Sequence, residues 1–283
     1  MDNNSSQPTV FVKGSFDDLK TIDIRFFQEA AKLGNVHVLL LSDEVSLINN
    51  NKRNKFPFHE RRYYLKSIRF VSQVTAINKA DRNIIPQPES LGVNNYPQPV
   101  WAVREKDANP EKRGFCRNNG FHYRIIPCSS LVGFPVEEAN EETHDPEKKK
   151  VMVSGCFDWV HTGHVRFFEE VSALGDLYVV VGHDKNLRLL KGKGHPLFPE
   201  EERVYWVQSI CYVKKAIVSS GDGWLDAAPE VHQIKPDIFI VNKDGDKPEK
   251  GKFFSDLNIE YKILERKPKP GLPTRVSTNL RGF

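Results

Sequence analysis

The stretch Gly155-Cys156-Phe157-Asp158-Trp159-Val160-His161-Thr162-Gly163-His164 follows the apolar Val151-Met152-Val153 and precedes Val165-Arg166-Phe167-Phe168. This order predicts a strand, a glycine turn and a helix. Two histidines in the first turn of such a helix would stand beside backbone N–H groups that have no partner inside the helix. Because that end of a helix favours negative charge, the stretch predicts a polyphosphate site as well as a fold.

The chain contains an internal repeat of this stretch. Gly14-Ser15-Phe16-Asp17 matches Gly155-Cys156-Phe157-Asp158, and Arg25-Phe26-Phe27-Gln28-Glu29 matches Arg166-Phe167-Phe168-Glu169-Glu170 at the same offset. The match continues to Pro110-Glu111-Lys112 and Pro248-Glu249-Lys250. We therefore expect two homologous units at 1–135 and 151–283, joined by a charged linker at 136–150.

Short apolar runs alternate with helical patterns in each unit. In the second unit we expect strands near 150–154, 177–182, 213–218, 237–242 and 259–264, and helices near 162–173, 199–210, 224–233, 249–257 and 276–281. This alternation predicts an α/β protein made of two tandem Rossmann-like units, each a doubly wound parallel sheet flanked by helices. Ligands of such sheets bind beyond the carboxyl ends of the strands, where the glycine turn lies.

The pattern Gly-x-Phe-Asp-x-x-His-x-Gly-His after a hydrophobic strand resembles the nucleotidyltransferase superfamily of cytidylyltransferases and small adenylyltransferases. Within it, the tandem duplication is most similar to the ethanolamine-phosphate and glycerol-phosphate cytidylyltransferases. The resemblance implies an enzyme that moves CMP from CTP to a phosphorylated small alcohol and releases pyrophosphate. Two alternatives stay open: an ATP-dependent adenylyltransferase of the same fold, and a nucleotide-binding pseudoenzyme or scaffold.

The resemblance also implies site residues. His161 and His164 would bind the triphosphate and stabilise the transition state, and Lys191 and Lys193, in a basic loop after the second strand, would close over the phosphates. The expected nucleotide-binding residues are Gly155, Cys156, Phe157, Asp158, Thr162, Gly163, Arg203, Asp244, Ser277 and Thr278. Helix capping explains Thr162 equally well. A structural role for Arg203 also stays open, because Glu60-Arg61 matches Glu202-Arg203 in a unit without the histidines.

Two segments depart from the pattern of the family. One is Val241-Asn242-Lys243-Asp244-Gly245-Asp246, and the other is Leu272-Pro273-Thr274-Arg275-Val276-Ser277-Thr278-Asn279. The arginine and the glycine of the family's closing motif are missing from their places in the second segment, and Arg275 or Arg266 could replace the arginine. Because of these departures, the sequence does not determine which nucleotide base or which acceptor substrate the protein uses.

The first unit has lost the motif. Lys20, Thr21, Ile22 and Asp23 stand where the second unit has His161-Thr162-Gly163-His164. Asp23 brings negative charge towards a phosphate site and Ile22 prevents the close backbone approach that glycine allows, so we expect this unit not to catalyse. Binding of a regulatory nucleotide there stays an alternative. We expect the two units to pair as an internal pseudo-dimer, which could form homo-oligomers.

The composition sets limits on function. The 283 residues are 39% hydrophobic and 28% charged with a formal net charge of +4, which is typical of a soluble globular protein and too mild to indicate a nucleic-acid binder. Since no apolar run has the length of a membrane span and the start does not resemble a signal peptide, we expect a cytoplasmic protein. No carboxylate cage for a metal is visible, so Mg²⁺ is expected as the counterion of the triphosphate.

Overall fold

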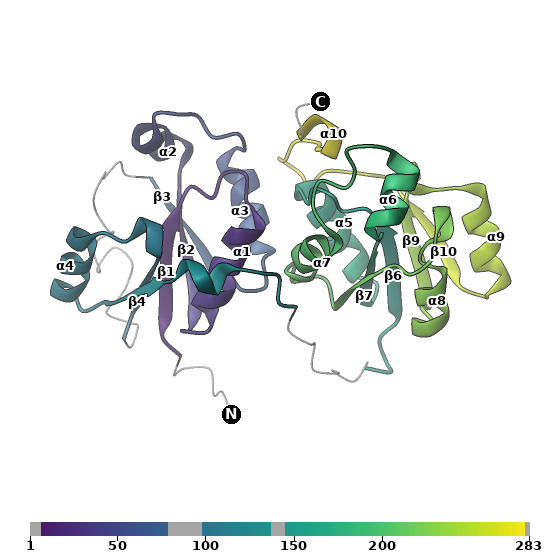
Figure 1. The fold of residues 1–283 in the computed structure, drawn as a ribbon, viewed down its shortest axis with the longest axis horizontal. Coiled ribbons are helices and arrows are strands. Elements are labelled where there is room, and N and C mark those ends of the chain that lie inside the picture. Colours follow the sequence, from purple (N-terminus) through teal and green to yellow (C-terminus); the bar gives the residue numbers. More distant parts are fainter. Residues whose placement is uncertain (1–6, 79–97, 137–144, 281–283) are drawn as a thin grey trace. The chain divides into compact units, whose positions relative to one another are not determined.

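The computed structural model describes residues 7–78, 98–136 and 145–280, with only the backbone of residues 50, 278 and 279. The chain divides into two compact units, Met1–Gly133 and Phe134–Phe283, which are described separately. Each unit is a parallel sheet with helices packed against it (Figure 1). Most of the predicted linker, residues 137–144, lies outside the described part of the chain.

The second unit contains a five-stranded parallel sheet in the order β10-β9-β6-β7-β8. Its strands are β6 (Lys150–Gly155), β7 (Asp176–Val181), β8 (Lys215–Val218), β9 (Ile238–Asn242) and β10 (Glu260–Leu264). The chain starts at the central β6, builds β7 and β8 on one side, and then crosses to β9 and β10 on the other. The direction of winding therefore changes between β6 and β9, and ligands of such sheets bind at that point.

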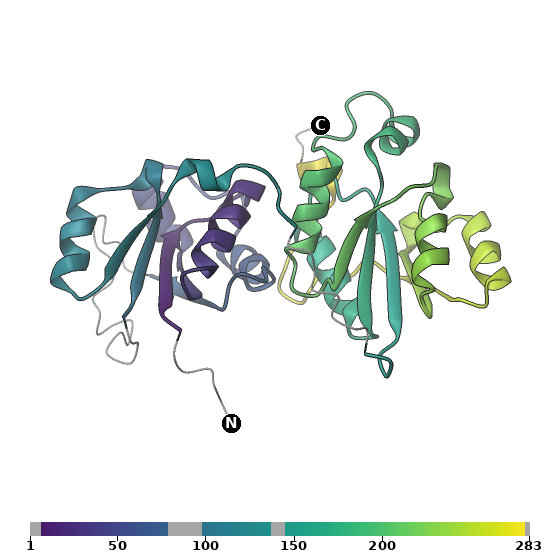
Figure 2. The same ribbon diagram turned by 60° about the horizontal axis from the view of Figure 1, so that its bottom comes forward.

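The helices of the second unit cover both faces of its sheet. They are α5 (Thr162–Ser172), α6 (Asp184–Lys191), α7 (Glu200–Gln208), α8 (Ala228–Ile234), α9 (Pro248–Asp256) and α10 (Ser277–Leu280), with short 3₁₀ turns η5 (Gly223–Leu225) and η6 (Lys243–Gly245). Figures 1 and 2 show α5 and α7 on one face and α8 and α9 on the other. The core under α8 and α9 contains Met152, Phe239 and Phe254, and the last two rings stack with centroids 4.1 Å apart.

The first unit has the same strand order, β3-β2-β1-β4-β5, and all its pairs are parallel. Its elements are β1 (Thr9–Gly14), α1 (Thr21–Ala31), β2 (Asn35–Leu41), α2 (Asp43–Asn50), α3 (Phe58–Lys66), β3 (Gln73–Ile77), β4 (Val100–Arg104), η3 (Glu105–Asp107), α4 (Pro110–Asn118), β5 (His122–Ile126) and η4 (Cys128–Leu131). The prediction of two Rossmann-like α/β units is confirmed.

One sequence-based prediction of local structure was wrong. The basic segment after β7, expected as a loop, begins with the helix α6. The His183 ring caps this helix, because its Nδ1 accepts a hydrogen bond from the Asn186 backbone N–H at 3.1 Å. Asn186 and Leu187 are buried beneath the charged residues of the helix. Those charges concealed the short amphipathic pattern.

A glycine after α1 and its repeat after α5 let the chain pass close to an earlier segment. Gly34 and Gly175 have φ of +146° and +155°. A Cβ on Gly34 would lie 2.0 Å from the Pro8 carbonyl oxygen, and one on Gly175 would lie 2.1 Å from that of Lys149. Both positions therefore require glycine for conformation and for space.

We expect Gly175→Ala to lower the free energy of unfolding of the second unit by at least about 1–3 kcal/mol, the usual cost of a strained backbone, because the methyl group also clashes with Lys149. Gly251→Ala is the matched control: Gly251 lies in α9 with nothing within 4 Å of its added Cβ. The control should be neutral or stabilising by up to about 1 kcal/mol. Urea unfolding measures both, and equal stabilities of the two variants would contradict the expectation.

Candidate active site

A cavity of about 370 Å³ opens at the carboxyl ends of β6 and β9, at the switch point of the second sheet. Its walls come from the glycine turn, α5, α6, the segment around η5, α9 and the C-terminal segment. The lining residues that bear on its chemistry are Gly155, Cys156, Asp158, His164, Asn186, Lys191, Trp224, Asp226, Asp244, Lys250, Arg266 and Ser277. Charged and polar groups from both halves of the unit therefore meet in one place.

The glycine turn brings an imidazole to this cavity. Phe157 adopts φ of +47°, and its ring packs edge-on against His164 and tilted against Phe168, with centroid distances of 5.4 Å and 5.3 Å. Since Phe168 is buried in α5, this packing fixes the turn to the helix that follows. His164 is thereby held in the first turn of α5, at the cavity wall.

The two histidines cap α5 through their own rings. Nδ1 of His161 accepts a hydrogen bond from the Gly163 N–H at 3.1 Å, and Nδ1 of His164 accepts one from the His161 N–H at 3.4 Å. The ring centroids are 4.0 Å apart. Because both Nδ1 atoms act as acceptors, both Nε2 atoms are the protonated, donating nitrogens in the neutral rings.

The surroundings keep both imidazoles neutral. Burial, with the positive charges of Arg266 and Arg275 adding to it, lowers the pKa of His161 to about 3. Burial also lowers the pKa of His164 well below its ordinary value, and the neighbouring His161, Arg266 and Lys191 act in the same direction. Neutral rings with donating Nε2 atoms suit the oxygens of a phosphate.

His161 carries an unused donor. Its side chain is 3% exposed, and its Nε2 is buried without a hydrogen-bond partner among the described residues. A buried polar atom left unpaired costs about 1–3 kcal/mol, so it calls for an explanation such as a ligand. Only His164 of the pair lines the cavity in this structure.

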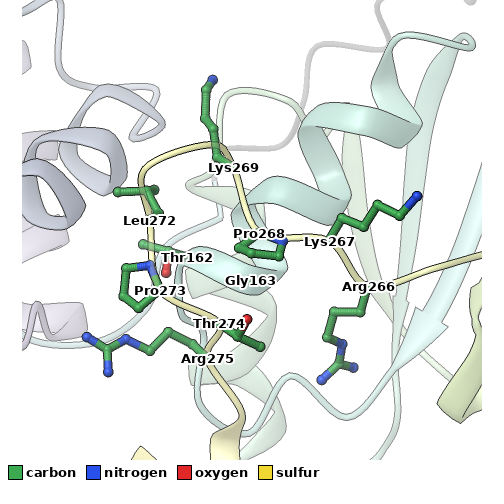
Figure 3. A pocket seen from close by; sticks show the side chains of 10 residues that line it. All are labelled: Thr162, Gly163, Arg266, Lys267, Pro268, Lys269, Leu272, Pro273, Thr274 and Arg275. Carbon is green, nitrogen blue, oxygen red and sulfur yellow. The ribbon is translucent and has the colours of Figure 1, made fainter.

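The segment 265–276 between β10 and α10, here named the strap, passes over the start of α5. Figure 3 shows it looping around Thr162 and Gly163, with which it encloses a pocket of about 10 Å³, roughly one water. The carbonyl oxygen of Arg275 lies 3.3 Å from the position of a Cβ on Gly163, so glycine permits this approach. An ion pair of 2.6 Å between Lys269 Nζ and Glu169 Oε1 ties the strap to α5.

The strap supplies an arginine to the cavity. Arg266 lines both the cavity and the small pocket, and it pairs with Asp244 at 2.8 Å. Its positive charge therefore contributes to the lowered pKa of both histidines. Of the two arginines considered from the sequence as replacements for the family arginine, Arg266 is the one that lines the cavity.

The structure brings together most of the predicted site residues. Those that line the cavity are Gly155, Cys156, Phe157, Asp158, His164, Lys191, Asp244 and Ser277, while Thr162 and Gly163 line the pocket under the strap. Lys193 is exposed and does not line the cavity. His161 does not line it either, although its ring centroid lies 4.0 Å from that of His164. The side chain of Thr278 lies outside the described part of the structure.

Arg203 lies beneath the site, fully buried. It donates to the carbonyl oxygens of Cys156 and Phe198 at 2.7 Å and 3.0 Å, and to Asp184 Oδ1 at 2.7 Å. Arg61 makes the corresponding bonds to Ser15, Phe56 and Asp43 in the first unit. This shared geometry supports the structural role that the sequence left open for Arg203.

Asp158 also has a structural role. Its carboxylate accepts hydrogen bonds from the Leu197 and Phe198 backbone N–H groups at 2.6 Å and 3.2 Å. Asp17 accepts the equivalent bonds from Lys55 and Phe56 in the first unit. In both units this aspartate therefore fastens the glycine turn to the segment that leads into the next long helix.

The corresponding place in the first unit is filled by the protein itself. Asp23 stands in the position of His164 and accepts a hydrogen bond from the Lys20 backbone N–H at 2.7 Å. It also forms an ion pair with Arg104, from the end of β4, whose guanidinium lies 4.9 Å from the centre of the Phe26 ring. A phosphate bound there would have to displace Asp23 from its arginine.

The residues of the cavity wall that were not predicted from the sequence include Asn186, Trp224, Asp226 and Lys250. Asn186 was hidden in the segment mistaken for a loop. Asp226 and Lys250 are single charged residues outside any motif, and they come close only through the crossover between the two halves of the sheet. No local pattern distinguishes them from surface residues.

Comparisons with known proteins agree with this geometry. A family model described as cytidylyltransferase-like matches residues 152–262. The chain is 39% identical over 128 residues to an FAD synthase of Archaeoglobus profundus, which covers 45% of this chain and 72% of the relative. It is 40% identical over 97 residues to an FAD synthase of Ferroglobus placidus, covering 34% of this chain and 60% of that relative.

Another relative is the bifunctional protein HldE of Helicobacter pylori, 31% identical over 127 residues, with 44% of this chain and 25% of the relative covered. A solved structure of a lipopolysaccharide core biosynthesis protein from Thermoplasma volcanium is 31% identical and covers 43% of this chain and 98% of that chain, with a TM-score of 0.36. The matches thus cover 60–72% of the two FAD synthases and a quarter of HldE.

The second unit has a parallel sheet with a histidine-lined cavity at its switch point, the architecture of a nucleotide-binding α/β enzyme. With the family match and the similarity to the FAD synthases, the chain belongs to the cytidylyltransferase-like family of nucleotidyltransferases. In the described part of the chain, no helix has the length and hydropathy that crossing a bilayer requires.

Burial of His161 predicts an acid-sensitive fold. Its pKa is about 3 in the folded protein, against an ordinary value of 6.5, so between these values the unfolded chain binds the proton that the folded chain does not. Stability therefore falls as the pH drops below about 6.5 and is unaffected above it. At pH 5 the loss due to this ring should be about 2 kcal/mol relative to pH 7.

Urea unfolding at pH 5 and pH 7 measures this loss, with His161→Gln as the control that cannot take up the proton. Wild type should lose about 2 kcal/mol more than the variant on going to pH 5. Equal losses would show that His161 is not held neutral by burial.

Proposed function

We propose that the second unit catalyses nucleotidyl transfer from a nucleoside triphosphate to a phosphorylated small alcohol, with CTP as the donor. A phosphate oxygen of the acceptor attacks the α-phosphorus, the bond from this phosphorus to the β-phosphate oxygen breaks, and pyrophosphate leaves. The observation that carries the proposal is the paired imidazole donors at the start of α5, beside the cavity. The unpaired Nε2 of His161 supports a phosphate ligand there.

The residues fit a reaction that needs positioning and charge neutralisation more than covalent chemistry. His164 and Lys191 line the cavity from α5 and α6, and Arg266 reaches it from the strap. Their positive or donating groups would hold the triphosphate and stabilise the charge that develops on the leaving pyrophosphate. Gly155 and Ser277 offer a close backbone approach and a hydroxyl for the nucleotide.

We propose Mg²⁺ as the companion of the triphosphate rather than as a resident of the protein. The described residues contain no group of three or more His, Cys, Asp or Glu side chains that could hold a metal ion. Asp226 and Asp244 both line the cavity, but protein groups already bond to one oxygen of each. Among the described residues, these two carboxylates therefore do not make a complete set of ligands for a metal ion.

A second candidate donor is ATP, giving adenylyl transfer. The relatives named FAD synthase favour it, because the product in that name contains an adenine nucleotide. The geometry of the phosphate site is the same for both donors. A nucleotide-binding pseudoenzyme is the remaining alternative, and release of pyrophosphate separates it from the two enzymes.

Purified protein with Mg²⁺, CTP or ATP, and a panel of phosphorylated alcohols should release pyrophosphate. His164→Ala should lower the rate on the order of a hundredfold to a thousandfold, since it removes a donor to the reacting phosphates. His232→Ala, an exposed histidine in α8, is the matched control and should keep the wild-type rate. Full activity of His164→Ala would refute the proposed role, and nucleotide binding without any pyrophosphate would favour the pseudoenzyme.

The chain should bind one nucleoside triphosphate, because Asp23 and Arg104 occupy the corresponding place in the first unit. Calorimetric titration with Mg²⁺ and a non-hydrolysable triphosphate should give one site per chain. Replacing both His161 and His164 by alanine should remove it, while Lys20→Ala in the first unit should leave it intact. A second site that survives the double substitution would instead support a regulatory nucleotide in the first unit.

A further inference from the structure

A buried lysine on α9 lines the same cavity as His164. Lys250, on α9, is 8% exposed and lines the cavity. Its Nζ donates a hydrogen bond to the Gly245 carbonyl oxygen at 3.1 Å, and Asp226 and Asp246 act on it through their charge, without an ion pair among the described residues. Burial lowers its pKa, which Asp226 and Asp246 oppose. A buried cation with unused donors is costly unless a ligand meets them.

A carboxylate whose charge acts on Lys250 lines the same cavity. Asp226 Oδ2 accepts hydrogen bonds from Asn186 Nδ2 at 3.0 Å and from Ser219 Oγ at 3.1 Å. Within the described residues, no hydrogen bond reaches its Oδ1. Asn186 is itself fixed by bonds to the backbone of Gly223, so Asp226 is held in place rather than mobile.

An indole ring lines this cavity as well. Trp224 lines the cavity with 52% of its surface exposed. The ammonium of Lys247 lies over its ring, 4.5 Å from the centre. The aromatic face that would otherwise attract a cationic ligand is therefore already used by a lysine.

From Lys250, Asp226 and Trp224 we infer that the acceptor is a phosphorylated polyol or sugar, whose hydroxyls bind between the lysine and the aspartate. This inference rests on the proposed transfer reaction and names its acceptor class. It separates the chain from enzymes that act on ethanolamine phosphate or choline phosphate. The apolar side of the same molecule would pack on the indole.

The chemistry of the two groups selects hydroxyls. An ammonium cation offers donors only and would meet the charges of Lys250 and Lys247, whereas a carboxylate offers acceptors only and would meet Asp226. A hydroxyl donates one hydrogen bond and accepts others, so it satisfies Asp226 and Lys250 together. A site that hydrogen-bonds a substrate hydroxyl rejects an analogue without it, because its buried polar groups are then left unpaired.

Lys250 could instead serve only to anchor the Gly245 carbonyl. Its counterpart in the repeat, Lys112, is half-buried in α4. If Lys250 only anchored this carbonyl group, its replacement would lower the stability of the protein and weaken the binding of all acceptors alike. A selective role would affect only ligands that carry hydroxyls, so acceptor selectivity tells the two apart.

Calorimetric binding tests the inference in the full chain with Mg²⁺ and the α,β-methylene analogue of CTP or of ATP. The probes are glycerol 3-phosphate, glucose 1-phosphate, phosphoethanolamine, phosphocholine and propyl phosphate, which has no hydroxyl. At least one of the two hydroxylated probes should bind on the order of tenfold or more tightly than propyl phosphate, a difference of about 1.4 kcal/mol. The two ammonium probes should bind no better than propyl phosphate.

Lys250→Met should reduce the preference for the hydroxylated probe about tenfold and leave propyl phosphate unchanged. Asp226→Asn is the second variant, and Lys252→Met, an exposed lysine on the same helix, is the matched control that should keep the preference. Thermal unfolding checks that each variant folds. Tighter or equal binding of an ammonium probe, no preference for hydroxyls, or a preference that survives in folded Lys250→Met would overturn the inference.

The same probes in the pyrophosphate assay keep the two proposals apart. Pyrophosphate release with phosphoethanolamine but not with the hydroxylated probes would retain the transfer reaction and overturn the acceptor class. Selective binding of a hydroxylated probe without pyrophosphate release would support the hydroxyl subsite and count against the transfer reaction.

Discussion

The site depends on the close contact between the first turn of α5, the glycine turn and the strap. Each histidine ring uses Nδ1 to accept a backbone N–H, so Nε2 is the donating nitrogen, and that of His161 has no partner among the described residues. Gly163 allows the strap to pass at 3.3 Å from where its Cβ would be. A Cβ at this position would also lie 2.8 Å from the His161 ring, so glycine keeps both the strap and the imidazole close to the start of α5.

The two units show which parts of the motif serve the fold and which serve the ligand. The aspartate of the glycine turn and the arginine beneath it make equivalent hydrogen bonds in both units. These groups hold the first strand, the turn and the following helices together. The histidines, by contrast, are replaced in the first unit by Lys20 and Asp23. In the first unit Asp23 forms an ion pair with Arg104, so the positive charge that a phosphate would otherwise meet is already neutralised.

The sequence predicted the sheet well and the cavity wall less well, for one physical reason. Buried parallel strands and the repeat leave strong local patterns, so the strands of the second unit were located to within one or two residues of their observed bounds. The helix α6 was missed because its charges hide a stripe of only Asn186, Leu187 and Leu190. Lys250 and Asp226 meet through the crossover of the sheet, and no local pattern records such a meeting.

The charged side chains of the cavity come from several elements of the second unit, an arrangement consistent with the proposed binding of two substrates. The histidines, Lys191 and Arg266 gather where α5, α6 and the strap meet, which suits a triphosphate with several negative charges. Lys250 lines the same cavity from α9, and Asp226 and the indole of Trp224 also line it. A lysine placed to neutralise the triphosphate would not need a carboxylate and an aromatic ring beside it. The combination suits the uncharged, hydroxylated part of the proposed acceptor, whose own phosphate can then point towards the histidines.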